Sequence, residues 1–465
     1  MTLDRLLRLG LAIMIVLQVG VLAYHLGLVV TFPYDLNYGE GYVLNDAVRL
    51  SRAEPLYVDL QQFPMVRSPY PPLFPLIWSW LVPLTGAQLW VGRALSVAGL
   101  IGVCGLLAWH ANRARAGRWA MVVAPGLVCA SPFVYQWAGF ARVDLLALML
   151  AVGGVLVAHW VPGWRGVMIA AALCGLALWT KQTTVTAALG VAIAVGLRDW
   201  RQGLGFSALV AGPTLACVAF LNQQTGGEFA RHVVFGNAIN PISLPRAIVY
   251  VGTLVVLHLP MFCVALWWLF RAGHRARSPI AVYVPVAMLA AFSVGNEGSS
   301  VNYLIEGVVA CALVLPLAWQ LVPKPVAMLA LAQLVLLVHW PNTFGTDYLF
   351  SGRTPTAADR VIASQVDELV RTQPGEVIAE PAGFAARNGL PVYLQPIDLR
   401  AEQVLGRWRS GPLVDALADG RFRLIVTAWD LFPEEVDRAI DAHFQVVQSL
   451  PSPDGMLFRI YRYAG

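Results

Sequence analysis

The sequence LGLAIMIVLQVGVLAYHLGLVV, residues 9–30, contains no Asp, Glu, Lys or Arg. A membrane-spanning helix needs about 20 mainly apolar residues, so this segment is long enough to cross a bilayer. Arg5 and Arg8 precede it, and the apolar run is longer than the core of a signal peptide and lacks a small-residue cleavage site. We therefore expect an uncleaved anchor whose N-terminal end faces the cytoplasm.

Similar apolar segments recur along the chain. They cover residues 88–110, 119–136, 143–161, 165–181, 183–197, 204–221, 247–270, 279–294, 302–320 and 325–341. Every connection that should then face the cytoplasm is basic, as the positive-inside rule requires. The basic residues are Arg113, Arg115, Arg118, Arg165, Arg198, Arg201, Arg271, Arg275, Arg277 and Lys324. The sequence therefore predicts a polytopic α-helical membrane protein of about eleven spans, with its C-terminal tail outside the cytoplasm.

Composition supports the same class. Of the 465 residues, 58% are hydrophobic and 13% are charged, whereas soluble domains carry about 25% charged residues. Residues 1–352 hold 20 basic and 12 acidic residues, a balance of +8, and residues 353–465 hold 12 and 15, a balance of −3. The basic excess therefore lies in the membrane part, where it sets topology, and we expect no nucleic-acid partner. All six cysteines lie in apolar segments, which excludes a disulfide framework in the tail.

The first outer loop, residues 31–87, is long and partly helical. Residues 42–52 place apolar side chains on one helix face and polar ones on the other, a pattern that predicts a helix on the membrane surface. Residues 71–83 are apolar but short and rich in proline, so we expect an interfacial or re-entrant helix there and no span.

The tail, residues 354–465, has a different sequence pattern from the membrane part. Strand-like runs occur at residues 376–380, 422–427, 444–449 and 456–463, with helix-like stretches at residues 357–372, 401–418 and 434–442. This alternation predicts a small extracytoplasmic α/β domain that follows a membrane domain of residues 1–345.

Ionisable residues beside apolar spans are costly to bury, so the presence of each one requires a structural or functional explanation. They form five clusters, at residues 33–42, 67–72, 142–144, 181–182 and 296–306. The eleven-span topology places all five on the outer side. Because that topology was derived without these residues, their common location supports a functional site.

The residue types suggest roles. Glu40 lies between Gly39 and Gly41, so its carboxylate could approach a substrate closely, as a general base or as a ligand of a divalent cation. Lys181 and Arg142 are cations at the membrane boundary, where a lipid-linked phosphate would lie. Glu40→Gln should then abolish catalysis without loss of folded protein.

Simpler interpretations remain open. Arg142 and Asp144 could anchor a helix end, and Lys181 could reach the interface without a ligand. Asn302 and Glu306, four residues apart on one helix face, could form a structural cap and an inter-helix hydrogen bond. Three further charged residues also have interpretations that involve no catalysis. Arg67 could contact lipid phosphate only, and Asp35 and Asp46 fit solvated loop charges better than catalysts.

Five strings carry a resemblance to a known family: YGEGYVLNDAVRLSRAEPLY (38–57), YPPLFPL (70–76), ARVDLLAL (141–148), WTKQT (179–183) and VNYLIE (301–306). Together they resemble the GT-C superfamily of membrane glycosyltransferases, and within it the protein O-mannosyltransferase and lipid A aminoarabinose transferase group. The resemblance covers roughly residues 1–345. The acidic pair of that family is Asp-Glu, and this chain has Gly39-Glu40 at the matching dipeptide.

The resemblance implies a hexosyl- or pentosyltransferase of the bacterial inner membrane. Such an enzyme moves a sugar from a polyprenyl-phosphate donor to an extracytoplasmic lipid, glycan or protein acceptor. The expected catalytic residue is Glu40, with Asp35 as second choice, as the base that deprotonates the acceptor hydroxyl. Lys181, Arg142 and Arg67 are expected to bind the donor phosphate, and the sugar pocket is expected to contain Tyr70, Asp144, Asn302, Tyr303 and Glu306.

Other functions are compatible with the sequence. A transporter or flippase for lipid-linked glycans would show inverted repeats and charges near the bilayer midplane, and a non-catalytic scaffold would only present the tail domain. Glu40, Asp35 and Glu306 could supply oxygen ligands to a divalent metal ion, but no spacing requires one. The sugar, the acceptor and the stereochemistry do not follow from the sequence.

Overall fold

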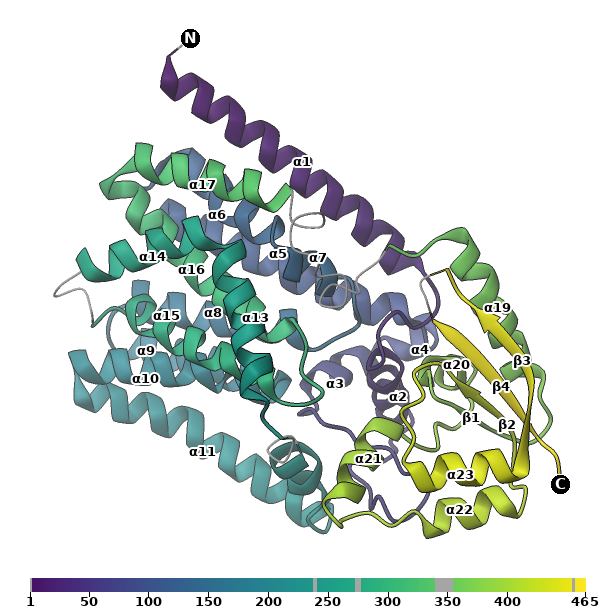
Figure 1. Cartoon of the computed structure of the whole chain (residues 1–465). Helices are drawn as coiled ribbons and strands as arrows, with labels where there is room; N and C mark the ends of the chain where they lie inside the picture. The colour runs from purple at the N-terminus through teal and green to yellow at the C-terminus, as the bar shows by residue number, and fades with distance from the viewer. Residues whose placement is uncertain (1, 237–240, 272–276, 339–353, 454–455) are drawn as a thin grey trace.

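A computed structural model describes residues 2–236, 241–271, 277–338, 354–453 and 456–465 (Figure 1). The helices of the N-terminal part form a broad bundle, and a small sheet with its own helices lies at one end of it. The bundle helices are α1 Leu3–Thr31, α5 Leu89–Arg113, α6 Gly117–Cys129, α7 Pro132–Trp137, α8 Asp144–Trp160, α9 Gly163–Thr180, α10 Val185–Arg198, α11 Trp200–Gln224, α13 Leu244–Leu257, α14 Leu259–Arg271, α15 Pro279–Ala290, α16 Asn302–Leu321 and α17 Pro323–Val338.

Within the described residues, five helices are long and apolar enough to cross a membrane: α1, α5, α9, α11 and α16. A sixth crossing results if the bent pair α13 and α14 is one span, and five further apolar helices are shorter. The chain is a multi-pass membrane protein, and the count of eleven spans stays a prediction. Arg275, the end of the predicted span 325–341, and the boundary between residues 345 and 354 lie outside the described residues.

The predicted helix at residues 247–270 is wrong as a single element. It consists of α13 and α14, which meet at an angle of 86°. Pro260, at the start of α14, has no backbone N–H to donate, and its ring would clash with the carbonyl four residues earlier in a straight helix, which favours a break at this point.

The first loop contains short helices, as expected: α2 Glu40–Ser51, α3 Leu73–Ser79 and α4 Val82–Thr85. The expected surface location of α2 is wrong. Every residue from Glu40 to Arg49 is buried, including Asn45, Asp46 and Arg49 on the polar face. The hydrophobic pattern identified the helix, but it could not show that segments distant in sequence enclose it: Gly41 packs on Gly383 of the C-terminal part, and Asp46 accepts a hydrogen bond from Ser68.

The C-terminal part contains a four-stranded sheet in the order β1-β2-β4-β3. Its strands are β1 Glu376–Ala379, β2 Phe422–Thr427, β3 Phe444–Pro451 and β4 Leu457–Tyr463. Strands β1 and β2 are parallel, while β4 pairs antiparallel with both β2 and β3. The helices are α19 Ala357–Thr372, α20 Ala382–Arg387, α21 Pro396–Val404, α22 Gly411–Ala418 and α23 Glu434–His443. This arrangement confirms the predicted combination of strands and helices, and it divides the helix expected at residues 401–418 into α21 and α22.

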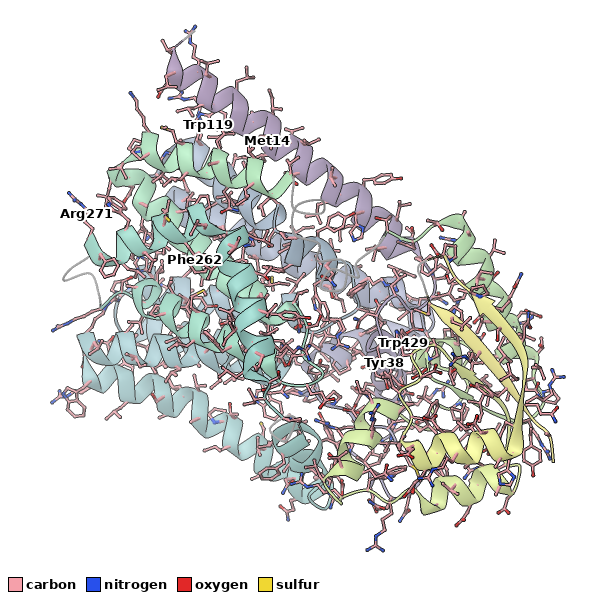
Figure 2. All side chains as sticks on the ribbon, viewed as in Figure 1. Met14, Tyr38, Trp119, Phe262, Arg271 and Trp429 are labelled. Atoms are coloured by element: carbon pink, nitrogen blue, oxygen red, sulfur yellow. The ribbon has the colours of Figure 1, made fainter. Side chains whose placement is uncertain are left out.

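The first loop and the C-terminal part share one hydrophobic core, in which Tyr34 and Tyr42 pack with Phe384 and Val426. Gly41 of α2 and Gly383 of α20 lie so close that a Cβ on Gly41 would come within 2.1 Å of the Gly383 nitrogen. Figure 2 labels Tyr38 and Trp429, whose rings meet edge to face at the same junction, 5.2 Å apart. The C-terminal part is therefore fixed against the loop by close packing.

Asp35 is buried at this junction, between Gly41 and Gly383. Neither of its carboxylate oxygens has a hydrogen-bond partner among the described residues. Burial, reinforced by the charge of Glu40, raises the pKa of Asp35 from 3.8 to about 7. The expectation of a solvated loop charge is therefore wrong for this residue.

Asp35→Asn should stabilise the protein at neutral and alkaline pH. Because the native pKa is above the unfolded one, the wild-type protein loses stability as the pH rises from about 4 to about 7. The amide does not titrate, so the variant should be more stable by roughly 4 kcal/mol at pH 8, with no advantage below pH 4. Melting temperatures in detergent at both pH values measure this difference. A variant that melts below wild type at pH 8 would contradict the prediction.

Candidate functional site

Two adjoining cavities lie in the bundle, and the larger of them extends to the first loop and the C-terminal part. The larger has a volume of about 620 Å³, and the smaller, about 230 Å³, lies among the helices. The two cavities share four lining residues: Lys181, Thr183, Ser293 and Tyr303. A ligand that passes between the compartments would therefore contact the Lys181 ammonium.

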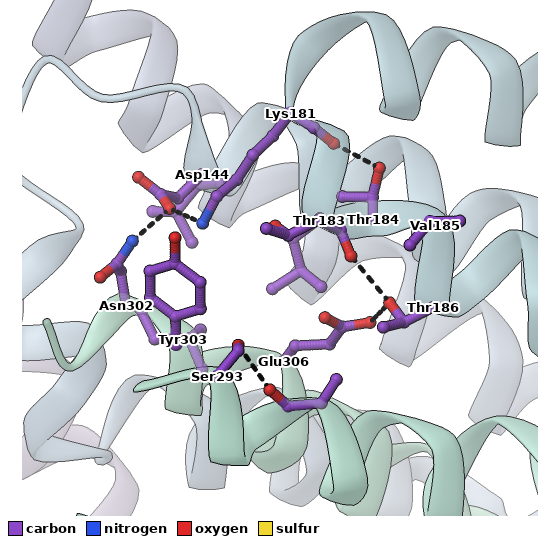
Figure 3. Close-up of a pocket in the computed structure, with 14 residues that line it drawn as sticks. Asp144, Lys181, Thr183, Thr184, Val185, Thr186, Ser293, Asn302, Tyr303 and Glu306 are labelled. Carbon is purple, nitrogen blue, oxygen red and sulfur yellow. Dashed lines mark hydrogen bonds and ion pairs between the residues drawn. The ribbon is translucent and has the colours of Figure 1, made fainter. Parts of the chain in front are cut away.

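Lys181 directly follows α9, and its side chain is held by partners from other helices (Figure 3). Its Nζ lies 2.6 Å from Asp144 Oδ1 and 4.3 Å from the centre of the Tyr303 ring. Asp144 also accepts hydrogen bonds from Asn302 Nδ2 at 2.7 Å and from Trp137 Nε1 at 2.8 Å. An ammonium group has three N–H donors, so the ion pair with Asp144 fixes Lys181 and leaves donors for a ligand.

Arg142 lines the larger cavity. Its Nη2 donates to the Tyr70 hydroxyl at 2.6 Å, and its guanidinium lies over the rings of Tyr70 and Trp137 at 5.5 and 5.6 Å. A Cβ on residue 39 would lie 1.3 Å from Arg142 Nη1. The guanidinium therefore occupies the space that any side chain at Gly39 would fill.

Glu306 lines the smaller cavity, one helical turn after Asn302 (Figure 3). Its Oε1 accepts hydrogen bonds from Thr186 Oγ1 at 2.5 Å and from the Tyr283 hydroxyl at 2.9 Å. The predicted sugar-pocket residues are thus brought together: Asp144, Asn302, Tyr303 and Glu306 line the smaller cavity, and Tyr70 and Tyr303 line the larger one.

Glu40 is placed differently from the expectation. Its side chain is 0% exposed, and it lines neither of the two larger cavities. Its Oε1 accepts from Arg93 Nε at 2.7 Å and from the Ala141 N–H at 2.8 Å. Its Oε2 accepts from Arg93 Nη2 and from the backbone N–H groups of Leu36 and Asn37. A carboxylate with five donors and no access to the cavity cannot take a proton from a substrate without rearrangement.

This arrangement gives Glu40 a positioning role. Arg93, also 0% exposed, donates to the carbonyls of Val29, Phe32 and Tyr34 at the end of α1. Glu40 thus connects the end of α1, through Arg93, to Ala141, the residue before Arg142. Sequence reasoning did not single out Arg93, because it occurs inside an apolar segment as an isolated charge.

Arg67 and Asp35 support the site from outside the two larger cavities. Arg67 is buried beside residues that line the larger cavity. Its Nη1 lies 3.1 Å from Asp398 Oδ1, and its Nε donates to the His232 carbonyl. Asp35 lies at the α2–α20 junction. Neither residue therefore lines the cavities that Arg142 and Lys181 line.

Sequence reasoning did not assign three charged residues of the larger cavity to the site: Asp46, Asp398 and Arg400. Asp46 is 4% exposed and accepts from Ser68 Oγ at 2.7 Å, and burial raises its pKa to about 7. The expectation that Asp46 is solvated is wrong because the neighbouring segments enclose α2. Asp398 and Arg400 come from α21, and no local pattern indicates that this helix meets the membrane part.

The three carboxylates that could supply oxygen ligands to a metal ion do not converge. Both oxygens of Glu40 contact Arg93, and Asp35 and Glu306 line different cavities. In the described part of the chain, no group of three His, Cys, Asp or Glu residues could hold a metal ion. The side chains therefore give no support to a metal centre built from these three carboxylates.

Comparisons with known proteins agree with this architecture. No protein-family model and no curated protein sequence matches the chain. Among solved structures, it is similar to ArnT from Cupriavidus metallidurans bound to undecaprenyl phosphate, with a TM-score of 0.61, 12% identity and coverage of 96% of this chain and 97% of ArnT. The apo form of ArnT gives the same TM-score and coverage at 15% identity. AglB from Archaeoglobus fulgidus gives a TM-score of 0.47 at 11% identity, over 95% of this chain and 74% of AglB. ArnT is a GT-C superfamily member, so the chain has the GT-C fold that its sequence motifs predict.

Proposed function

We propose that this protein is a membrane glycosyltransferase that moves a sugar from a polyprenyl-phosphate donor to an extracytoplasmic acceptor. The observation that carries the proposal is the convergence of Arg142 and Lys181, from separate segments, on one large cavity. The similarity in fold to an ArnT structure that is bound to undecaprenyl phosphate supports this choice of donor. The basic connections support a cytoplasmic N-terminus and an outer C-terminal domain in a bacterial inner membrane.

The donor phosphate would bind between the two cations. Arg142 is held by Tyr70, and Lys181 by Asp144, so neither charge has to be ordered when the ligand arrives. Breaking the bond between the anomeric carbon and the phosphate oxygen leaves the electron pair, and the growing negative charge, on the phosphate. Fixed cations in an enclosed site stabilise such charge more than water does.

The sugar would occupy the smaller cavity, which opens beside Lys181. Glu306 accepts both of its described hydrogen bonds at Oε1, so Oε2 is available to a sugar hydroxyl. Asn302 lies one turn away on the same helix. Polar groups in a preformed pocket discriminate between ligands, because a ligand that cannot form hydrogen bonds with them leaves those groups without partners.

A two-stage experiment tests the function. Purified protein in lipid nanodiscs is first titrated with undecaprenyl phosphate, and binding is measured. It is then incubated with labelled undecaprenyl-phosphate pentoses and hexoses and a lipid extract, and the release of undecaprenyl phosphate is followed. We expect binding and the consumption of one donor. Movement of label across sealed vesicles without loss of the sugar would instead identify a flippase.

Lys181→Met should weaken the binding of undecaprenyl phosphate about 10- to 100-fold, because a hydrogen bond to a charged group contributes about 1.5–3 kcal/mol. Lys324→Met is the control, since Lys324 is exposed at the start of α17 and lines neither of the two cavities. Equal affinities of the two variants would exclude Lys181 from the phosphate site.

A further inference from the structure

Helix α21 of the C-terminal part forms one wall of the larger cavity. It contributes Ile397, Asp398, Arg400, Ala401 and Val404 to the lining. The backbone N–H of Ile397 donates to the Tyr38 hydroxyl at 3.1 Å, which ties this helix to the first loop. The C-terminal part is thus built into the cavity that contains Arg142 and Lys181.

Asp398 is anchored through one oxygen. Its Oδ1 lies 3.1 Å from Nη1 of the buried Arg67. In the described structure its Oδ2 accepts no hydrogen bond, and the side chain, 18% exposed, faces the cavity. One oxygen therefore fixes the carboxylate, while the other can accept a proton from a ligand.

Three carboxylates line the larger cavity within the described ranges: Asp46, Glu297 and Asp398. Glu297 is exposed. The cations that act on Asp46 and Asp398 differ. Burial raises the pKa of Asp398, and Arg67 and then Arg142 oppose that rise, whereas the cation that opposes the raised pKa of Asp46 is Arg49. Asp398 therefore lies within electrostatic range of Arg142 as well as of Arg67.

We propose that Asp398 is the general base that accepts the proton of the acceptor hydroxyl. This inference rests on the proposed function. Oδ2 takes the proton while the acceptor oxygen forms a bond to the anomeric carbon. The bond from that carbon to the phosphate oxygen breaks, and polyprenyl phosphate leaves with the electron pair beside Arg142 and Lys181. The acceptor is then an alcohol bound between α21 and the donor, and the C-terminal domain completes the active site.

Asp398→Asn tests this assignment. Its transfer rate is measured with the undecaprenyl-phosphate sugar that the wild-type protein consumes, and its affinity is measured with undecaprenyl phosphate alone. Loss of a general base typically costs 10²–10⁴-fold in rate. We expect a loss of that size with affinity close to wild type. Asp415→Asn, an exposed carboxylate on α22 of the same domain, should keep both properties.

A purely structural role would behave differently from a base. Asp398→Glu keeps the carboxylate but moves its oxygens by one methylene group. Relative to Asp398→Asn, it should recover part of the transfer rate, and it should shift the acidic limb of the pH–rate profile. It also provides the test if Asp398→Asn folds poorly. Wild-type rates in Asp398→Asn, or an unchanged pH profile in Asp398→Glu, would overturn the assignment. Failure of the wild-type protein to bind undecaprenyl phosphate would instead overturn the proposed function.

Discussion

Glu40→Gln is expected to lower the free energy of unfolding by about 3–5 kcal/mol, because it leaves a completely buried guanidinium without its counter-ion. Glu40 and Arg93 are both 0% exposed, with Arg93 Nε and Glu40 Oε1 2.7 Å apart. The amide removes the charge, and its NH₂ group cannot accept the hydrogen bonds that one carboxylate oxygen accepts now. This result replaces the expectation, drawn from the sequence, that the variant would fold normally.

The melting temperature in detergent measures the effect. Glu434→Gln is the matched control, because the Glu434 side chain is 87% exposed and its pair with Arg438 lies on the surface, where such pairs contribute about 0–1 kcal/mol. A double variant, Glu40→Gln with Arg93→Gln, should lose less than the sum of the single losses, since the two residues form one unit. If Glu40→Gln melts like wild type but transfers no sugar, Glu40 would return as the candidate base.

Gly39→Ala is expected to weaken the binding of undecaprenyl phosphate about 10- to 100-fold, by displacing Arg142 from the phosphate site. The backbone of Gly39 has φ −83° and ψ −9°, which alanine adopts without strain. The new methyl group would lie 1.3 Å from Arg142 Nη1, so the guanidinium must move away. The effect should therefore appear in affinity more than in stability.

Titration of the variant with undecaprenyl phosphate, beside a thermal melt, separates these two effects. Gly105→Ala in α5 is the control, because a Cβ there meets no atom within 4 Å. Arg142→Gln should lose affinity to a similar degree, and the combination with Gly39→Ala should add little. An unchanged affinity in Gly39→Ala would show that the present position of Arg142 is not the one that binds phosphate.

The sequence by itself determined the local elements. Apolar segments located most of the bundle helices within a few residues, although the segments at residues 119–136 and 247–270 each contain two helices. Strand-like runs located the four strands, because hydropathy and backbone preference act over short stretches of chain. The same reasoning placed six polar residues at or near helix ends, and the structure puts each of them in the lining of one or both cavities, while their roles stay predictions: Arg142, Asp144, Lys181, Asn302, Tyr303 and Glu306. Pro260 was visible too, but its break in the helix at residues 247–270 was overlooked.

Only the tertiary structure decided which charged groups face the cavities. Glu40 and Asp398 are separated by most of the chain. Glu40 is paired with the buried Arg93, and Asp398 on α21 is paired with the buried Arg67. Whether a carboxylate is a structural partner or a base depends on the donors around it and on its access to the cavity. These donors come from distant segments that meet only after folding, so no local pattern could assign the two roles.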